Sequence, residues 1–220
     1  MDWALFFTIV VVGIIVFFEF TNGFHDAANA IATSVGTRAL TPPIALAIAA
    51  VFNFVGAFIG YWTGSGVAKT IQSVTTPSSG YDGLALVASA VIGAILWNLT
   101  TWRLGLPSSS THALIGGVVG AAIVAGTGVA WATVLDKVVI PMFTSPFVGL
   151  ILAFAVMRLI RQIFRNKDPH AVGGGFRHAQ TVSAAAMAMG HGMQDAQKSM
   201  GVIFLALVSM GFLAADATMP

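Results

Sequence analysis

Long apolar stretches, each close to the length of a membrane-spanning helix, run through most of the chain. A helix needs about 20 apolar residues to cross the hydrocarbon core of a bilayer. Six stretches come near that length, at residues 3–20, 44–62, 84–102, 114–131, 146–163 and 199–215. Only 8% of the 220 residues are charged, against about 25% in a soluble domain. The pattern lacks strand-like alternation, so it predicts an all-α polytopic membrane protein with about six spans.

Two short motifs place an acidic residue inside this apolar sequence. Both read Gly-x-x-Asp-Ala, and their acids, Asp26 and Asp195, are 169 positions apart. An ionisable group at bilayer depth is costly unless it is paired or hydrated, so it usually has a function. Matching motifs in two halves are typical of inverted-repeat transporters that build one site from interrupted helices. We therefore expect broken or re-entrant helices at both motifs.

Positive charge gathers at the end of the fifth apolar stretch and between it and the sixth. Five of the ten Lys and Arg residues lie there, namely Arg158, Arg161, Arg165, Lys167 and Arg177. Cytoplasmic loops carry such an excess, and the Asp-Pro pair at 168–169 and the glycines at 173–175 also indicate a loop. We expect a first membrane repeat at 1–157, a basic cytoplasmic linker at 158–180 and the beginning of a second repeat at 181–220. The alternative is a basic loop without a repeat boundary.

The first motif carries several polar side chains close together. On a helix, His25 and Asn29 share a face, and Asp26 reaches Asn29 at i, i+3. Carboxylate and amide oxygens suit a hard cation or a proton, and Asn22 just before the motif could add another amide. The alternative is an exposed helix–loop junction. Glu19 is either a carboxylate on the ion path or an anchor at the membrane surface.

The second motif has the same acid with different neighbours. His191, Gln194 and Gln197 surround Asp195, and Lys198 follows it at i, i+3. Lys198 can form a purely structural salt bridge with Asp195, or it can lend its charge to an anion site. Both interpretations stay open.

A third polar group, at residues 107–112, reads Pro-Ser-Ser-Ser-Thr-His and precedes an apolar run. Ser and Thr cap helix N-termini, where free N–H groups attract anions. The hydroxyls of Ser108, Ser109, Ser110 and Thr111 could therefore hold a phosphate-like oxyanion. An ordinary N-cap at the membrane surface is the alternative.

At these residues the chain resembles the PiT-type inorganic phosphate transporter family, in its bacterial low-affinity branch. That family carries a Gly-x-Asn-Asp or Gly-Phe-His-Asp signature in each of two inverted repeats, and a Pro-x-Ser-x-Thr-His element. Residues 23–26 and 107–112 match these motifs, and residues 192–195 read Gly-Met-Gln-Asp at the place of the second signature. The resemblance implies secondary transport of inorganic phosphate, with proton coupling in this branch. The sodium-coupled branch usually has Asn where His25 stands.

The resemblance also implies roles for single residues. The phosphate-binding residues would be Asn29, Ser108, Ser109, Ser110, Thr111 and Gln197. The residues carrying the coupling ion or proton would be Asp26, Asp195, His25 and Asn22, with Glu19, His112 and Lys198 as further candidates. The family repeats the Ser/Thr-His element in its second half. The 81-residue spacing from Asp26 to Pro107, applied from Asp195, ends beyond residue 220, so we expect one full repeat and the opening of an incomplete second one.

The expected partners are inorganic phosphate, a coupling H⁺ or Na⁺ and the lipid bilayer of the inner (plasma) membrane, without a cofactor, a resident metal or nucleic acid. A homodimer is left open. A transporter or channel for divalent metal or metal phosphate, with Asp26, Asp195 and His25 as ligands, is the alternative. An enzyme is not expected, because Ser110 and His112 do not share a helix face and neither a Gly-x-Ser-x-Gly nor a His-Glu-x-x-His motif occurs.

Overall fold

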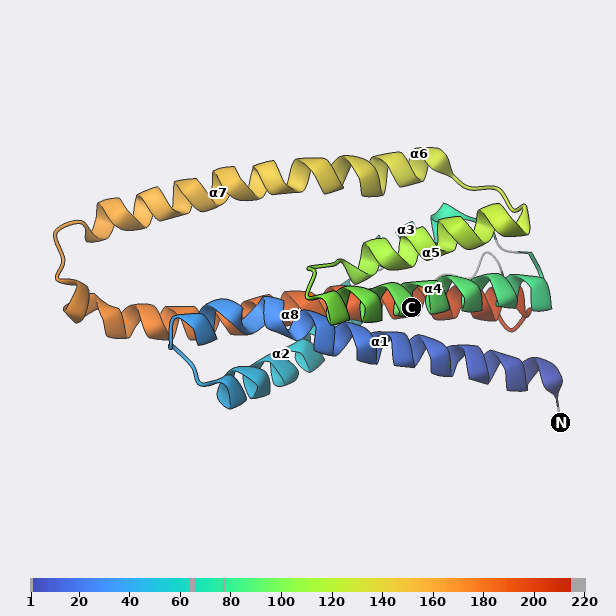
Figure 1. Cartoon of the computed structure of the whole chain (residues 1–220), viewed down its shortest axis with the longest axis horizontal. Coiled ribbons are helices and arrows are strands. Elements are labelled where there is room, and N and C mark those ends of the chain that lie inside the picture. The colour runs from blue at the N-terminus through green and yellow to red at the C-terminus, as the bar shows by residue number, and fades with distance from the viewer. Residues whose placement is uncertain (1, 64–65, 77, 215–220) are drawn as a thin grey trace.

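The computed structural model of the chain describes residues 2–63, 66–76 and 78–214. Its elements are almost entirely helical (Figure 1). In chain order they are α1 (Trp3–Gly36), α2 (Pro42–Thr63), α3 (Gly66–Val74), α4 (Tyr81–Leu104), α5 (Ser110–Ala125), α6 (Trp131–Val134), the π-helical segment η1 (Leu135–Val139), α7 (Ile140–Phe164) and α8 (Pro169–Ser209).

Several helix ends follow from local sequence signals. The side chain of Asp2 accepts a hydrogen bond from the Ala4 N–H at the start of α1, and Asp168 does the same for His170 at the start of α8. Such side chains satisfy N–H groups that have no partner inside the helix. At their C-termini, α4 and α5 stop at Gly105 and Gly126, whose positive φ angles of 65° and 69° suit glycine.

Four helical runs are long and apolar enough to cross a membrane. They are α1, α2, α4 and the continuous run Trp131–Phe164. This result confirms the all-α, multi-pass membrane class, but the expected number of about six spans is wrong for the part of the chain that the structure describes. The stretch 114–131 is divided at Gly126, and α8, which contains most of the stretch 199–215, ends at Ser209. Residue 215 lies outside the described residues.

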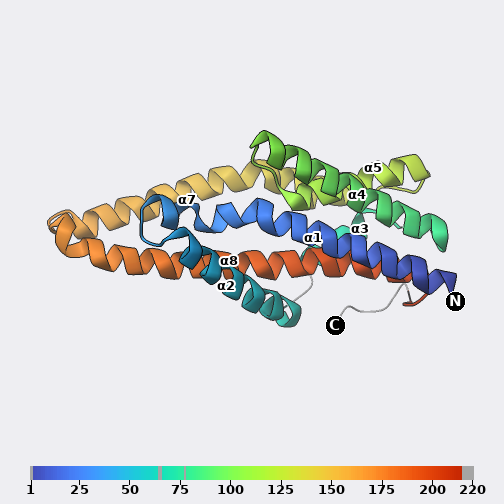
Figure 2. The ribbon, with the colours of Figure 1, turned by 60° about the horizontal axis from the view of Figure 1, so that its bottom comes forward.

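The two motif-bearing helices, α1 and α8, lie side by side and run in opposite directions (Figures 1 and 2). The α4–α5 hairpin packs along one half of this pair, so that its turn at residues 105–109 lies near the middle of α1 and α8. Antiparallel motif copies are what an inverted repeat requires.

Neither motif interrupts its helix. Residues 22–29 lie inside the continuous α1, and residues 191–198 lie inside the continuous α8. The prediction of broken helices at the motifs is therefore wrong. Glycine permits unwinding but does not enforce it, and here the helical hydrogen bonds continue through both motifs. The chain reverses instead at the α4–α5 turn.

The predicted linker is also mostly helical. α7 continues to Phe164 and α8 begins at Pro169, so only residues 165–168 lie between the two helices. The three glycines at 173–175 belong to α8, although a Cβ on any of them would meet no atom within 4 Å. Their contacts do not explain why they are helical. The expected loop over 158–180 is thus wrong, while a repeat boundary in this region stays a prediction.

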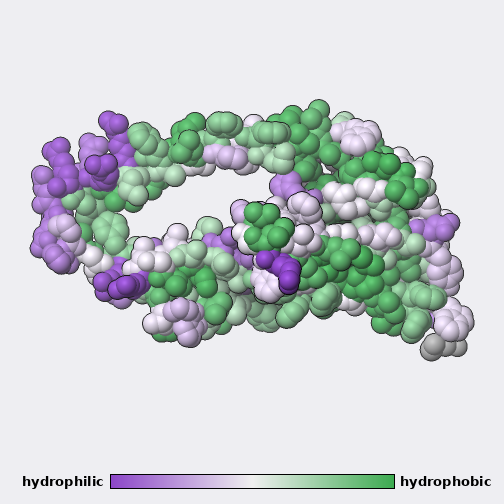
Figure 3. Space-filling model, in the orientation of Figure 1, coloured by the Kyte–Doolittle hydropathy of each residue, from purple (hydrophilic) through white to green (hydrophobic). Residues whose placement is uncertain are grey.

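Helix α7 lies apart from the other helices. None of its residues is buried, and a space-filling view shows an opening between α7 and the rest of the molecule (Figure 3). The hydrophilic end in this view is where α7 meets α8, near the exposed Arg161 and Arg165. The apolar sides of α7 therefore face outward, as expected for a helix in contact with lipid.

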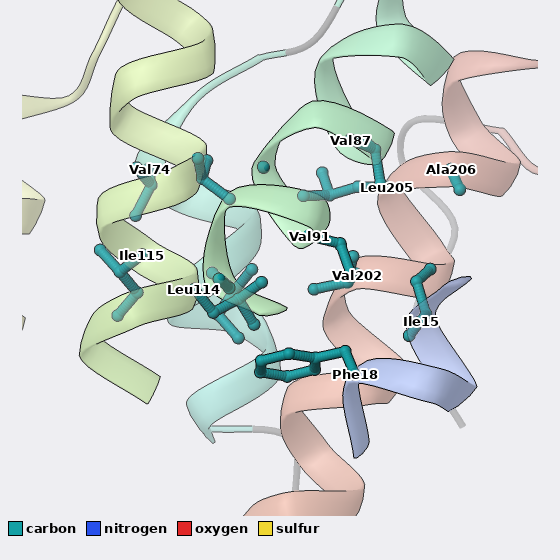
Figure 4. Packing of buried hydrophobic residues seen from close by; sticks show 14 of the residues in the cluster. Ile15, Phe18, Val74, Val87, Val91, Leu114, Ile115, Val202, Leu205 and Ala206 are labelled. Atoms are coloured by element: carbon teal, nitrogen blue, oxygen red, sulfur yellow. The ribbon is translucent and has the colours of Figure 1, made fainter. Parts of the chain in front are cut away.

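The apolar core lies on the side of the motifs that faces the start of α1 and the end of α8. Its central side chains come from α1, α4, α5 and α8, and they include Ile15, Phe18, Val91, Leu114 and Val202, all nearly inaccessible (Figure 4). Phe18 is two turns before Asp26, and Val202 is two turns after Asp195. The apolar core therefore borders the space between Asp26 and Asp195 on one side.

The contact between α2 and α8 is made by very small residues. A Cβ on Gly56 would collide with the backbone of Met189, and one on Gly60 would lie 2.6 Å from the carbonyl oxygen of Met193. From the other side, a Cβ on Gly192 would collide with the backbone of Asn53. Small residues four positions apart allow such backbone contact between membrane helices. We call this contact the glycine seam.

Candidate functional site

Five side chains from three helices form a closed ring of polar contacts. Oδ2 of Asp26 accepts from the hydroxyl of Ser110 at 3.5 Å, and Ser110 accepts from Nζ of Lys198 at 2.8 Å. Lys198 Nζ also lies 2.8 Å from Oδ1 of Asp195. Nε2 of His191 lies 3.1 Å from Oδ2 of Asp195 and 3.9 Å from Oδ2 of Asp26, which closes the circle. We call these five residues the carboxylate ring, and it joins all three sequence motifs.

The first motif adds further contacts to Asp26. Nδ1 of His25 lies 2.9 Å from Oδ1 of Asp26, and Nε2 of the same ring lies 3.3 Å from the hydroxyl of Thr101 in α4. Nδ2 of Asn29 donates to the same carboxylate oxygen at 3.4 Å. The expected grouping of His25, Asp26 and Asn29 is therefore present, although Asn29 itself is exposed.

Lys198 is the buried cation of the ring. Only 1% of its surface is accessible, and its ammonium group lies 5.8 Å from the centre of the Phe18 ring. A buried ammonium is stable only when it is paired and hydrogen-bonded. Asp195 and Ser110 supply these partners, so the predicted i, i+3 pair exists, and it is also joined to the third motif.

Further polar groups face the ring without good hydrogen bonds. Glu19 lies within electrostatic reach of Lys198 and Asp195 and next to Ser199 and Asn22. Among the described residues, Oε1 of Glu19, both amide atoms of Asn22 and the Ser199 hydroxyl are buried without a hydrogen-bond partner. Buried polar groups are nearly always satisfied by protein, water or an ion. Glu19, Asn22 and Ser199 lie next to one another and therefore form a polar cluster beside the ring.

A cavity of about 480 Å³ opens beside the ring between α1, α2 and α8. Its polar lining comes from Glu19, Asn53, His191 and Asp195, and the rest of its wall is made largely of alanine and glycine. A water molecule takes about 30 Å³. The cavity therefore has room for a small hydrated solute next to the carboxylates.

The four consecutive hydroxyls of the third motif do not gather at one place. Ser110 belongs to the ring, whereas Ser108 accepts from Nε1 of Trp97 at 2.9 Å. Ser109 caps α5, with its Oγ 2.7 Å from Nδ1 of His112. Thr111 and His112 line a separate cavity together with Lys137 of η1. Side chains on a helix point about 100° apart, so consecutive residues at its start face different surroundings.

Gln197 also lies away from the ring. Its Oε1 accepts from the N–H of Val67 at the N-terminus of α3 at 3.1 Å. This contact holds the short helix α3 against α8. It also occupies Oε1 of Gln197, a side chain that was expected to bind phosphate.

The sequence placed His191 in the second motif without a role, and it did not indicate Thr101 at all. The i, i+4 spacing from Asp195 could have identified His191 as its partner on a helix. No local signal identifies Thr101, because its contact with His25 joins residues 76 positions apart.

Residues 22–174 match the family model described as "Phosphate transporter family". This match includes the first motif and the Pro-Ser-Ser-Ser-Thr-His segment. The chain belongs to the phosphate transporter family.

Curated relatives carry names that agree with this family. A "Probable low-affinity inorganic phosphate transporter" of Streptomyces halstedii is 53% identical over 195 residues, which are 88% of this chain and 89% of that protein. A protein of the same name from Mycobacterium leprae is 42% identical over the whole chain. The "Low-affinity inorganic phosphate transporter PitB" of Escherichia coli is 36% identical over 89% of the chain.

The chain spans about half the length of several of these phosphate transporter relatives. It corresponds to 52% of the Mycobacterium leprae protein and 44% of the Escherichia coli protein. No solved structure matches the chain.

Proposed function

We propose that this chain is part of a secondary active transporter of inorganic phosphate. The transporter would carry phosphate across the inner (plasma) membrane, coupled to protons or sodium. The single observation that carries the proposal is the carboxylate ring. It joins the three polar motifs where the start of α5 meets the antiparallel helices α1 and α8. Transporter sites typically lie at such a position, at the contact between two repeats.

The charges at the ring favour coupling between an anion and a cation. The carboxylates of Glu19 and Asp195 act on the ammonium group of Lys198. The carboxylate of Asp26 is joined to it through the Ser110 hydroxyl, so three carboxylates gather around one ammonium group. An anion that approaches such a site is repelled unless protons or cations reduce the negative charge. Phosphate binding at this site is therefore expected to depend on simultaneous uptake of positive charge.

The relatives' names support phosphate as the cargo, since they are low-affinity inorganic phosphate transporters. Within the described residues there is no group of three or more His, Asp and Glu side chains arranged to hold a metal ion. We therefore prefer phosphate to a divalent metal. Uptake that is inhibited by free metal and unaffected by an excess of unlabelled phosphate would favour the metal instead.

The test is uptake of labelled phosphate into vesicles that contain the full-length protein. Asp26→Asn should reduce uptake about tenfold or more, because a hydrogen bond to a charged group contributes about 1.5–3 kcal/mol. Asp82→Asn is the matched control, since Asp82 is exposed in the first turn of α4, and it should transport normally. Normal uptake by Asp26→Asn would remove this carboxylate from the mechanism.

A further inference from the structure

The two motif copies differ in the residue three positions after the acid. In the first copy this residue is Asn29, whose neutral amide donates to Oδ1 of Asp26. In the second copy it is Lys198, whose ammonium group contacts Oδ1 of Asp195 at 2.8 Å. The same position on the same kind of helix therefore holds an amide in one half and a positive charge in the other.

The surroundings of Lys198 Nζ are those of a cation site. Oxygens of Asp195 and Ser110 lie at 2.8 Å, and the carboxylate of Glu19 acts on it electrostatically. Carboxylate and hydroxyl oxygens are the ligands that hard cations prefer. The aromatic ring of Phe18 lies on another side, where it adds a favourable cation–π contact.

We propose that Lys198 is a resident cation, which occupies the position that a free monovalent cation would otherwise take and thereby excludes sodium from the ring. This inference rests on the proposed phosphate transport. Because the ammonium is tethered to α8, it cannot cross the membrane with the cargo. The positive charge that accompanies phosphate then has to be supplied by protons instead of by sodium at this position.

The decisive variant is Lys198→Asn, which gives the second copy the amide that the first copy has. It removes the ammonium and leaves the oxygens of Asp195, Ser110 and Glu19 around a position that sodium can occupy. Lys198→Arg keeps the charge at the same position. Lys69→Asn makes the same substitution at an exposed lysine and serves as the matched control.

Phosphate uptake by full-length protein in proteoliposomes is measured in sodium chloride and in choline chloride at one pH. The unaltered protein, Lys198→Arg and Lys69→Asn should take up phosphate equally in both media. Lys198→Asn should be nearly inactive in choline and recover severalfold in sodium. A lysine that only stabilised the fold would not produce this dependence. Sodium-dependent uptake by the unaltered protein, or a Lys198→Asn variant indifferent to sodium, would overturn the proposal.

Thermal unfolding of the same purified proteins separates this inference from the proposed function. A ligand that binds only the folded state raises the unfolding temperature. Sodium should therefore stabilise Lys198→Asn and leave the unaltered protein unchanged. If the unaltered protein takes up no phosphate in either medium, the proposed function fails. The sodium-dependent shift of Lys198→Asn then still supports the resident cation, and its absence overturns it.

Discussion

The two Gly-x-x-Asp-Ala motifs share a pattern but have different surroundings. Gly23 of the first motif faces open space, since an added Cβ would meet no atom within 4 Å, whereas a Cβ on Gly192 would collide with the backbone of Asn53. Three positions after the acid, Asn29 is exposed and Lys198 is buried. At these two positions the first copy is open and the second copy is packed against its neighbours. The acids show the reverse order, because the side chain of Asp26 is 7% exposed and that of Asp195 is 13% exposed.

Each acid nevertheless has its own imidazole, reached by a different route. His25 directly precedes Asp26, and His191 lies one helical turn before Asp195. The second copy has Gln194 where the first has His25, and the first has Asn22 where the second has His191. Both motif copies therefore pair their carboxylate with an imidazole, although the histidines stand at different positions of the two copies.

The largest expected difference between the copies is in stability. Asp195→Asn leaves the buried Lys198 without its carboxylate, and breaking a buried ion pair costs about 3–5 kcal/mol. Asp26→Asn leaves no buried ammonium unpaired, so its unfolding temperature should stay much closer to that of the unaltered protein. Thermal unfolding in detergent measures both. Equal unfolding temperatures for the two variants would contradict the difference between the copies.

A smaller effect is expected for the two motif glycines. Gly192→Ala forces a methyl group into the glycine seam, and such overpacking typically costs about 1–3 kcal/mol. Gly23→Ala adds the same group in open space and should leave stability unchanged or slightly higher. The two purified variants are compared by thermal unfolding. If Gly23→Ala proved the more destabilising of the two, the assignment of the open and packed copies would be reversed.

The smallest effect concerns the two glutamines of the second copy. Gln197→Ala removes the hydrogen bond to the N-terminus of α3, and a typical hydrogen bond contributes about 0.5–1.5 kcal/mol. Gln194→Ala changes an exposed side chain and should have no measurable effect. Hydrogen exchange of the α3 amides should rise only in Gln197→Ala. An equal rise in both variants would show that the contact with Val67 is not what holds α3.

Much of the site could be predicted from spacing. The Asp195–Lys198 pair and the His25, Asp26 and Asn29 group follow from helical periodicity, and the Ser109 cap follows from the hydroxyl-rich start of α5. These predictions hold because they depend only on residues within one helical turn of one another. The resemblance to one family was confirmed by the family match over residues 22–174 and by the curated relatives.

The errors concern features that depend on distant parts of the chain. Gly23 and Gly192 suggested broken helices, but the sequence does not say whether a neighbouring backbone or empty space faces a glycine. The four hydroxyls at 108–111 looked like one site, whereas only Ser110 meets Lys198 and Asp26, which are 88 and 84 positions away. The predicted loop at 158–180 failed because the glycines at 173–175 lie inside a 41-residue helix.

The glycine seam brings the backbones of α2 and α8 together with no side chain between them. Helices in such close backbone contact cannot slide past one another by changing rotamers, because the contact contains no side chain that could move aside. Helices α2 and α8 should instead move together as one rigid frame. This frame includes Asp195 and Lys198. The α4–α5 hairpin meets this frame through Ser110, and its turn contains a left-handed Gly105. A displacement of the hairpin relative to this frame would therefore change the contact between Ser110 and Lys198 directly.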